Sequence, residues 1–335
     1  MIDWKRTVRV GATELFVPRI GLGTASLGNL LVPTTDDEAI GVIRHALDAG
    51  IKYIDTAPLY GHGLAEQRVR RAVAGRPREE LVLSTKVGRL LREGAPPDES
   101  QYHEGEPFYR DVPSAGPTWD FSENGVRTSV AESARRVGVE HFDMLLMHDP
   151  DDHYLEASTT GYQALDALRR EGSVTAVGAG MNHTEIQTQL VRHCDLDAVL
   201  VAGRYTLLDQ TAMDELLPTC VERDVSVVIG GVFNSGVLVD PSPGARFDYI
   251  PASDEVVARA QSIQKVCQRH GVPLAAAALQ FPLAHPRVCS VLLGPRSIAE
   301  LDTNLHLLEL DIPPQLWRDL IDDGLIRQDA PVPVQ

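Results

Sequence analysis

The chain reads FDMLLMH at residues 142–148, a short apolar run that ends on a polar residue. Its length and composition predict a buried β-strand, Phe142–Met147, with His148 at its C-terminal end. The amphipathic stretch Tyr162–Glu171 predicts a helix, and the next apolar run, Thr175–Gly180, predicts another strand. This order predicts a βαβ unit, in which the two strands lie parallel.

The same alternation continues toward both ends of the chain. One helix starts at Thr35-Asp36-Asp37-Glu38, which looks like a capping box, and ends at Gly50. The predicted strands are Ile20–Gly23, Tyr53–Asp55, Val82–Lys86, Phe142–Met147, Thr175–Gly180, Ala198–Ala202, Ser226–Gly230 and Val288–Leu293. The other predicted helices are Glu123–Val137, Tyr162–Glu171, Thr184–His193, Asp214–Arg223, Asp254–His270 and Ile298–Leu308.

Eight such units close most simply into a (β/α)₈ TIM barrel of the α/β class. The alternative is an open doubly wound sheet, which normally binds a dinucleotide through G-x-G-x-x-G after its first strand. Here that position reads GLGTAS at residues 21–26, which lacks the third glycine. We therefore expect one barrel domain that spans residues 1–335.

Three segments lie outside this alternation. Thr7–Val10 and Glu14–Val17 predict a hairpin before the first strand, which would plug the bottom of a barrel. Residues 87–119, after the third strand, are rich in proline, glycine and charge. Because barrel active sites lie at this end of the strands, we expect this long loop to cover the substrate. We expect the last segment, residues 325–335, to be a flexible tail.

Composition limits the class of partner. The 335-residue chain has a formal net charge of −16, which disfavours nucleic acid. The N-terminus lacks an apolar signal core, and no apolar run approaches the roughly 20 residues that cross a bilayer. We expect a cytoplasmic enzyme with no membrane partner, either a monomer or a weak homo-oligomer. The cysteines lack metal spacing and are expected to be buried reduced thiols; they are Cys194, Cys220, Cys267 and Cys289.

Four polar residues mark the C-terminal ends of consecutive predicted strands. Asp55, Lys86 and His148 close strands two, three and four, and Tyr60 lies in the loop after strand two. In a barrel these ends converge at one mouth. Each residue taken singly also has a structural interpretation, as an ion pair or a packing residue. As a set at neighbouring strand ends, they predict an active site.

The four side chains make a coherent proton-transfer group. A phenol has an ordinary pKa of about 10, and a nearby ammonium group lowers it. We expect Lys86 to lower the pKa of Tyr60 and Asp55 to balance the charge of Lys86. His148 would orient the substrate oxygen or join the proton relay. A metal site at residues 148–153, HDPDDH, is disfavoured because the spacing matches no established ligand pattern.

With these motifs in order from about Ile20 to Leu308, the sequence resembles the aldo-keto reductase superfamily. That resemblance implies a catalytic tetrad of Asp55, Tyr60, Lys86 and His148, with hydride transfer to or from a nicotinamide cofactor. The motifs are Gly21-Leu22-Gly23-Thr24; Asp55-Thr56-Ala57-Pro58-Leu59-Tyr60-Gly61 with Glu66; Ser84-Thr85-Lys86-Val87-Gly88; Asp143–His148; Val177-Gly178 through Asn182; and Gly294-Pro295-Arg296-Ser297 with Asn304.

The resemblance also implies how a cofactor would be held. Asn182 would hydrogen-bond the nicotinamide carboxamide, and the segment from Gly294 to Asn304 would hold the adenosine end and its phosphates. Arg296 would pair with a 2′-phosphate and Glu300 would repel it, so NAD is favoured over NADP. The cofactor-binding residues expected on this basis are Gly23, Thr24, Asp55, Asn182, Gly294, Arg296, Ser297, Glu300 and Asn304.

Three positions depart from the usual family pattern. Met181 replaces a common Ser, Ala202 replaces a common Gln, and Gly230 replaces the Tyr that usually stacks on the nicotinamide. Phe233 is a candidate to stack there instead.

These departures, with residues 202–210, 230–236 and 148–152, look like the D-threo-aldose 1-dehydrogenase branch, with L-fucose and galactose dehydrogenases and pyridoxal 4-dehydrogenase. That branch implies oxidation of a sugar hemiacetal such as L-fucose to a lactone. The alternatives are an aldehyde or ketone reductase, a pyridoxal oxidiser, a regulatory subunit that binds cofactor without turnover, and a metal-dependent barrel hydrolase.

Overall fold

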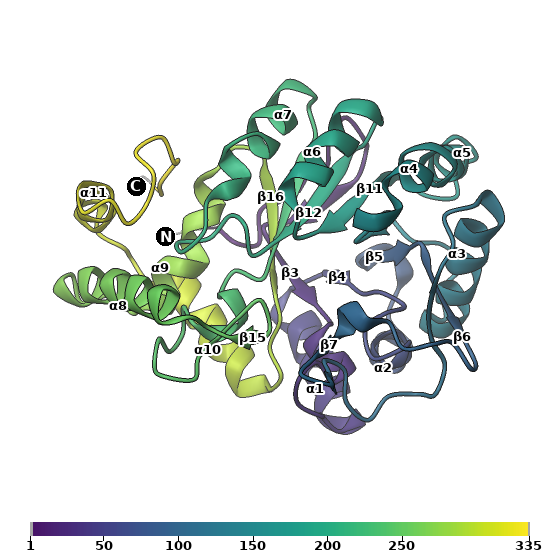
Figure 1. Ribbon diagram of the computed structural model, residues 1–335, viewed down its shortest axis with the longest axis horizontal. Helices are drawn as coiled ribbons and strands as arrows, with labels where there is room; N and C mark the ends of the chain where they lie inside the picture. Colours follow the sequence, from purple (N-terminus) through teal and green to yellow (C-terminus); the bar gives the residue numbers. More distant parts are fainter. Residues whose placement is uncertain (1–2, 334–335) are drawn as a thin grey trace.

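The computed structural model describes residues 3–333, and the eight predicted strands form a closed parallel barrel. The strand order around the barrel is β10-β11-β12-β13-β16-β3-β4-β5, so the first barrel strand pairs with the last. Figure 1 shows the strands in the middle of the molecule with the helices around them. The predicted fold is confirmed. The barrel strands are β3 (Ile20–Gly23), β4 (Tyr53–Asp55), β5 (Val82–Val87), β10 (Met144–His148), β11 (Ala176–Met181), β12 (Ala198–Ala202), β13 (Ser226–Gly230) and β16 (Val288–Leu293).

The helices follow the signals in the sequence where those signals are strong. In the first helix, Thr35 and Glu38 form the predicted capping box, and the N–H of Gly50 closes the last turn on Ala46 and Leu47. The surrounding helices are α1 (Asp36–Ala49), α2 (Leu64–Val73), α3 (Glu123–Val137), α4 (Tyr154–Glu156), α5 (Tyr162–Arg170), α6 (Thr184–His193), α7 (Leu216–Glu222), α8 (Asp254–Arg269), α9 (Leu274–Gln280), α10 (Ile298–Glu309) and α11 (Pro314–Asp322).

Four of these helices were not predicted, and one of them, α4, is a single turn of three residues. In α2 two charged residues, Glu66 and Arg68, are buried with the apolar ones, so the apolar face is hard to see in the sequence. Six of the seven residues of α9 are buried, so this helix has no polar face and no amphipathic period. The last, α11, follows α10 without a strand between them. The alternation rule therefore gives no reason to expect it.

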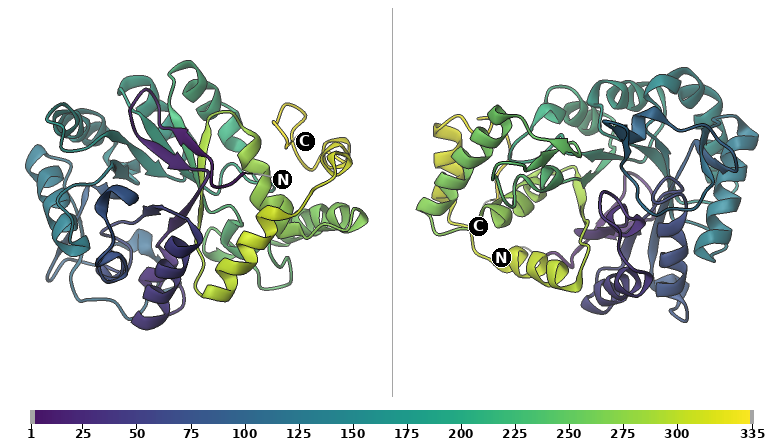
Figure 2. Two further views of the ribbon diagram at one scale, coloured as in Figure 1. Left: turned by 180° about the vertical axis from the view of Figure 1, so that it is seen from behind. Right: turned by 60° about the horizontal axis from the view of Figure 1, so that its bottom comes forward.

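The predicted N-terminal hairpin is present and covers one end of the barrel. Strands β1 (Thr7–Arg9) and β2 (Phe16–Pro18) pair antiparallel. The N–H of Gly11 donates a hydrogen bond to Oγ of Ser226 at 2.8 Å. Val10, Leu15 and Val17 are buried in one cluster with side chains of the barrel strands. Seen from behind, the hairpin lies across the strands at the end opposite the long loop (Figure 2).

The long loop after β5 is folded into two small hairpins. Strand β6 (Arg89–Arg92) pairs with β9 (Gly116–Trp119), and β7 (Tyr102–His103) pairs with β8 (Glu106–Pro107). Gly88 makes the bend between β5 and β6 at a φ of 101°. A Cβ there would lie 2.3 Å from the Phe121 ring, so glycine is required.

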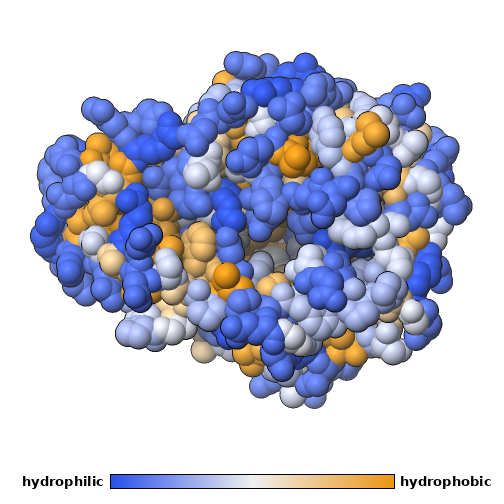
Figure 3. Space-filling model, viewed as in Figure 1, coloured by the Kyte–Doolittle hydropathy of each residue, from blue (hydrophilic) through white to orange (hydrophobic). Residues whose placement is uncertain are grey.

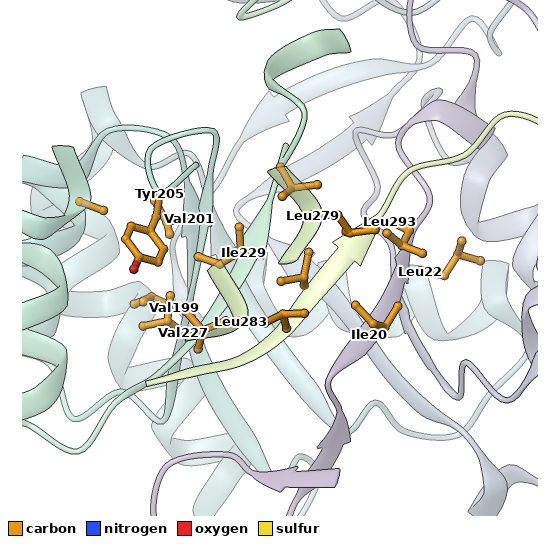
Figure 4. Packing of buried hydrophobic residues seen from close by; sticks show 14 of the residues in the cluster. Ile20, Leu22, Val199, Val201, Tyr205, Val227, Ile229, Leu279, Leu283 and Leu293 are labelled. Carbon is orange, nitrogen blue, oxygen red and sulfur yellow. The ribbon is translucent and has the colours of Figure 1, made fainter. Parts of the chain in front are cut away.

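The main hydrophobic core lies between the barrel strands and the helices. Figure 4 shows side chains of β3, β12, β13 and β16 packed against Leu279 of α9 and against Tyr205 and Leu283. All four cysteines are unpaired and buried, as predicted. Within residues 3–333, no helix has both the length and the apolar composition of a membrane span.

Candidate active site

A buried ion pair lies at the C-terminal ends of β4 and β5. Nζ of Lys86 lies 2.6 Å from Oδ1 of Asp55, and each residue is only 1 % exposed. Lys86 also donates to the Thr56 carbonyl at 3.1 Å, and Ser84 donates to the second oxygen of Asp55 at 2.6 Å. Because both charges have hydrogen-bonding partners, the pair can exist away from water.

Tyr60 lies over this pair, in the loop between β4 and α2. Its ring centroid is 4.5 Å from Nζ of Lys86, and its ring meets that of His148 edge to face, with centroids 5.7 Å apart. The loop can turn here because Gly61 adopts a φ of 63° and packs against Gly28, where a Cβ would lie 2.4 Å from the Gly28 carbonyl oxygen. The structure thus brings Asp55, Tyr60, Lys86 and His148 together.

The environment of Tyr60 differs from the prediction in one respect. Burial raises the pKa of the Tyr60 phenol well above its usual value, and the negative charge of Asp55 raises it further. We predicted that Lys86 would lower this pKa. That prediction was wrong because the ammonium group is bonded to Asp55 and lies beside the ring, with no hydrogen bond to the phenol oxygen. The phenol is therefore protonated at neutral pH.

His148 is neutral in this site. Burial lowers its pKa well below the usual value, and the positive charges of Lys86 and Arg89 lower it further. Its Nδ1 atom is buried and has no hydrogen-bond partner among residues 3–333. A neutral imidazole carries one donor and one acceptor, so His148 can hydrogen-bond a substrate oxygen without adding a charge.

Two charged residues beside the tetrad were not predicted from the sequence. Arg89 follows β5, and Asp149 follows His148 directly; their side chains approach to 3.4 Å. Arg89 is 3 % exposed, pairs with Asp98 at 2.7 Å, and places its guanidinium 4.0 Å from the centre of the Trp119 ring. Asp149 lies 3.5 Å from Nε2 of His148. The only signal in the sequence that could have found them is their position: Arg89 comes three residues after Lys86, and Asp149 directly follows His148.

Aromatic side chains from two loops surround the mouth of the barrel. Tyr109, from the loop after β5, lies 6.3 Å from the Tyr60 ring. Phe108 lies 5.7 Å from Tyr249, which belongs to the hairpin of β14 (Arg246–Phe247) and β15 (Ile250–Pro251). Figure 3 looks onto this face, where the surface is hollowed near the centre. The loop after β5 and the loop after β13 therefore meet over the tetrad.

The residues expected at the nicotinamide end are only partly available to a ligand. Gly23 pairs with Asp55 in the barrel, and both the N–H and Oγ1 of Thr24 donate to the Asp55 carbonyl at 3.0 Å. The Thr24 hydroxyl is therefore already bonded within the protein. Asn182 follows β11 and is half-buried, and its side chain makes no hydrogen bond within the described residues. Its amide is thus available to a carboxamide.

The segment expected to hold the adenosine end lies at the start of α10. Ser297 caps that helix by accepting from the N–H of Glu300 at 3.1 Å. Glu300 accepts from the N–H of Arg296 at 2.8 Å, and the Arg296 guanidinium donates to the Leu30 carbonyl at 3.3 Å. Nε of Arg296 is buried without a partner among residues 3–333. Gly294 is exposed and Asn304 is half-buried, so both lie open to this surface.

These positions fit a dinucleotide with its nicotinamide near Asn182 and its adenosine near α10. Of the three residues that depart from the family pattern, Met181 is buried, and Ala202 and Gly230 are paired neighbours in β12 and β13. Phe233 packs against the main core, and whether it also stacks on a cofactor stays a prediction. No group of three or more His, Cys, Asp or Glu side chains within residues 3–333 is arranged to hold a metal ion.

Comparison with known proteins agrees with this geometry. Residues 19–321 match the model of the aldo/keto reductase family. The chain is 42 % identical to a D-threo-aldose 1-dehydrogenase of Pseudomonas sp over 94 % of this chain and 96 % of that protein. It is 40 % identical to a pyridoxal 4-dehydrogenase of Microbacterium luteolum, over 95 % and 97 %. An aldo-keto reductase of Bacillus halodurans has a similar structure, with a TM-score of 0.74, 26 % identity and 98 % coverage of each chain.

Proposed function

This chain belongs to the aldo/keto reductase family, and from that premise we propose that it oxidises an aldose such as L-fucose at C1 to the lactone. The observation that carries the proposal is the convergence of Asp55, Tyr60, Lys86 and His148 at one mouth of the barrel. The relative at 42 % identity, a D-threo-aldose 1-dehydrogenase, supports the substrate class. The electron acceptor would be NAD or NADP, which takes up hydride when it is bound.

In this reaction the sugar loses one hydride and one proton. The C1–H bond breaks with its electron pair, which leaves as hydride, and the C1 hydroxyl loses its proton to the phenolate form of Tyr60, which becomes the neutral phenol as the lactone carbonyl forms. We assign His148 to hydrogen-bond the substrate oxygen. The Lys86 ammonium group lies beneath Tyr60, 4.5 Å from the centre of its ring, and the Asp55 carboxylate balances its charge.

For the cofactor we propose NAD in preference to NADP. The Glu300 carboxylate occupies the N-terminal end of α10, where it accepts from the Arg296 amide. A 2′-phosphate placed there would meet this negative charge. The Arg296 guanidinium, the obvious partner for a phosphate, is already bonded to the Leu30 carbonyl. Asn182, Gly294, Ser297 and Asn304 would complete the site.

We also propose that residues 87–119 form a lid over the substrate. Tyr109 of this segment packs on Tyr60, and Leu30 forms a bridge with Tyr109 that ties the segment to the loop after β3. Limited proteolysis with and without cofactor tests this role. Cleavage within residues 87–119 should slow when cofactor is present, and identical cleavage would show that the segment is no lid.

A second function is favoured by one specific observation. The raised pKa of Tyr60 keeps its phenol protonated, and a protonated phenol is the form that donates a proton to a carbonyl oxygen. The enzyme would then act mainly as an aldehyde or ketone reductase. The relative at 40 % identity, a pyridoxal 4-dehydrogenase, widens the range of substrates to test.

One assay separates these functions. We would follow the absorbance of reduced nicotinamide with NAD and NADP in turn, against L-fucose, D-arabinose, L- and D-galactose, L-xylose and pyridoxal. Fast cofactor reduction with one sugar would establish the aldose dehydrogenase. Consumption of reduced cofactor with simple aldehydes, and no sugar oxidation, would establish the reductase instead.

A further inference from the structure

Arg89 and Asp149 form an incompletely bonded charge pair directly beside the tetrad. They follow the neighbouring strands β5 and β10, which are paired along Met144–Met147, so their side chains rise from the same side of the mouth. Both charges act on the Tyr60 phenol, with Asp149 raising its pKa and Arg89 lowering it. The pair therefore lies within electrostatic reach of the atom that would exchange the proton.

The bonding of these two side chains leaves capacity for a ligand. The closest partner of Arg89 is Asp98, at 2.7 Å, and its distance to Asp149 is 3.4 Å, which is long for a charge-assisted hydrogen bond. Nε of Arg89 and Nδ1 of His148 are buried without partners in the part of the chain that the structure describes. A buried donor or acceptor without a partner is costly. The Asp149 side chain is 33 % exposed, so its carboxylate is open to a substrate hydroxyl.

The surroundings hold the pair in place. The guanidinium of Arg89 stacks on Trp119, and the Trp119 ring packs at 5.9 Å on Phe121 and at 4.7 Å on His153. The Asp149 backbone turns out of the strand at a φ of 41°, with its N–H bonded to the Gly180 carbonyl at 3.0 Å. Both charged groups are thus fixed before a substrate arrives, which reduces the entropy lost on binding.

We propose that Arg89 and Asp149 recognise two neighbouring hydroxyl groups of the substrate and so select polyhydroxylated substrates over simple aldehydes. A carboxylate only accepts hydrogen bonds and a guanidinium only donates them, whereas each sugar hydroxyl does both. Two adjacent hydroxyls can therefore bridge the 3.4 Å gap between the two side chains. The inference rests on the proposed function for the identity of the natural substrate.

Such a site discriminates between substrates mainly through the protein groups that a poor substrate leaves without a hydrogen bond. A simple aldehyde would cover the partly exposed Asp149 carboxylate without replacing its hydrogen bonds to water, and sites of this kind can reject such analogues strongly. A merely structural role is the alternative, in which Arg89 only fastens the loop through Asp98. The two roles predict different effects of Asp149→Asn and Asp98→Asn.

The test compares reduction of D-glyceraldehyde and propanal, two three-carbon aldehydes that differ by two hydroxyl groups. The ratio of their kcat/KM values is measured for the wild type, Asp149→Asn, Arg89→Lys and Asp98→Asn, with the Kd of reduced cofactor as a check on folding. We expect Asp149→Asn to lower the ratio by about 10- to 100-fold, mainly through a higher KM for glyceraldehyde. Arg89→Lys should lower it as well, because lysine lacks the planar fork and the stacking surface.

The outcomes are separable from those of the aldose assay. An unchanged ratio in Asp149→Asn would overturn the inference, and so would an equal fall in Asp98→Asn, which would indicate loop fastening. If the wild type oxidises no aldose but the ratio falls in Asp149→Asn, the proposed function is wrong and the hydroxyl site stands. If the wild type oxidises an aldose but the ratio is unchanged in Asp149→Asn, the proposed function stands and the hydroxyl site is wrong.

Discussion

Nζ of Lys86 lies 2.6 Å from the carboxylate of Asp55, and no other carboxylate forms an ion pair with Lys86 within the described residues. Removing one partner of a buried pair leaves the other charge without compensation. The pair therefore determines both the charge beneath Tyr60 and part of the stability of the barrel.

Asp55→Asn should destabilise the protein by about 3 to 5 kcal/mol in urea unfolding, because the Lys86 ammonium loses its counter-charge in a buried site. The matched control is Glu80→Gln, which breaks the exposed pair with Lys52 and should cost less than about 1 kcal/mol. An equal loss of unfolding free energy in the two variants would show that the buried pair stabilises the protein no more than the exposed pair does.

Tyr60→Phe should lower kcat by roughly 100- to 10,000-fold, because it removes the only phenol placed beside both Lys86 and His148 within the described residues. Cofactor binding should stay within about twofold of the wild type, measured by fluorescence titration, because the aromatic ring is kept. Tyr109→Phe removes the neighbouring phenol and should cost less than about tenfold. A larger loss of kcat in Tyr109→Phe than in Tyr60→Phe would show that Tyr60 is not the residue that transfers the proton.

The rate of oxidation should rise with pH. The pKa of Tyr60 lies well above its usual value, so the basic phenolate needed to accept a proton becomes more abundant at every step above neutrality. Reduction needs the protonated phenol and should be flat from about pH 7 to 9. At the acidic end, burial raises the pKa of Asp149 to about 6, so sugar binding through this carboxylate should weaken below that pH. An oxidation rate that peaks near pH 7 would contradict this assignment.

Glu300→Lys should shift cofactor use toward NADP. The change removes the carboxylate bonded to the Arg296 amide and puts a cation at the start of α10, so the ratio of kcat/KM for NADP to that for NAD should rise about tenfold or more. Glu309→Lys makes the same charge change at the other end of that helix and should leave the ratio unaltered. A shift of the same size in both variants would mean that overall charge governs the preference.

The parts of this protein that sequence predicts are those fixed by local pattern. Asp55, Lys86 and His148 close consecutive strands, and parallel strands of a barrel necessarily end at one mouth, so their convergence followed from the order of elements alone. The helix start at Thr35 could be predicted for the same reason, because its capping box involves residues only three positions apart.

The rest depends on distances that no local pattern contains. The pKa of Tyr60 is raised by burial and by Asp55 and lowered by Arg89, and these contributions follow only from the positions of the groups in the folded chain. The Arg296 guanidinium is bonded to Leu30, 266 residues away in sequence, and Arg89 meets Asp149 across 60 residues. These contacts depend on the paths of two irregular loops.

Closure of the barrel also has a consequence for how the protein is made. Strand β3 pairs with β16, the side chain of Arg19 donates to the Val288 carbonyl at 2.9 Å, and Gly11 bonds to Ser226. A ribosome releases the N-terminal hairpin and β3 long before their partners emerge. The nascent chain therefore carries an open sheet edge through most of translation, and this edge is exposed to wrong pairing until β16 arrives.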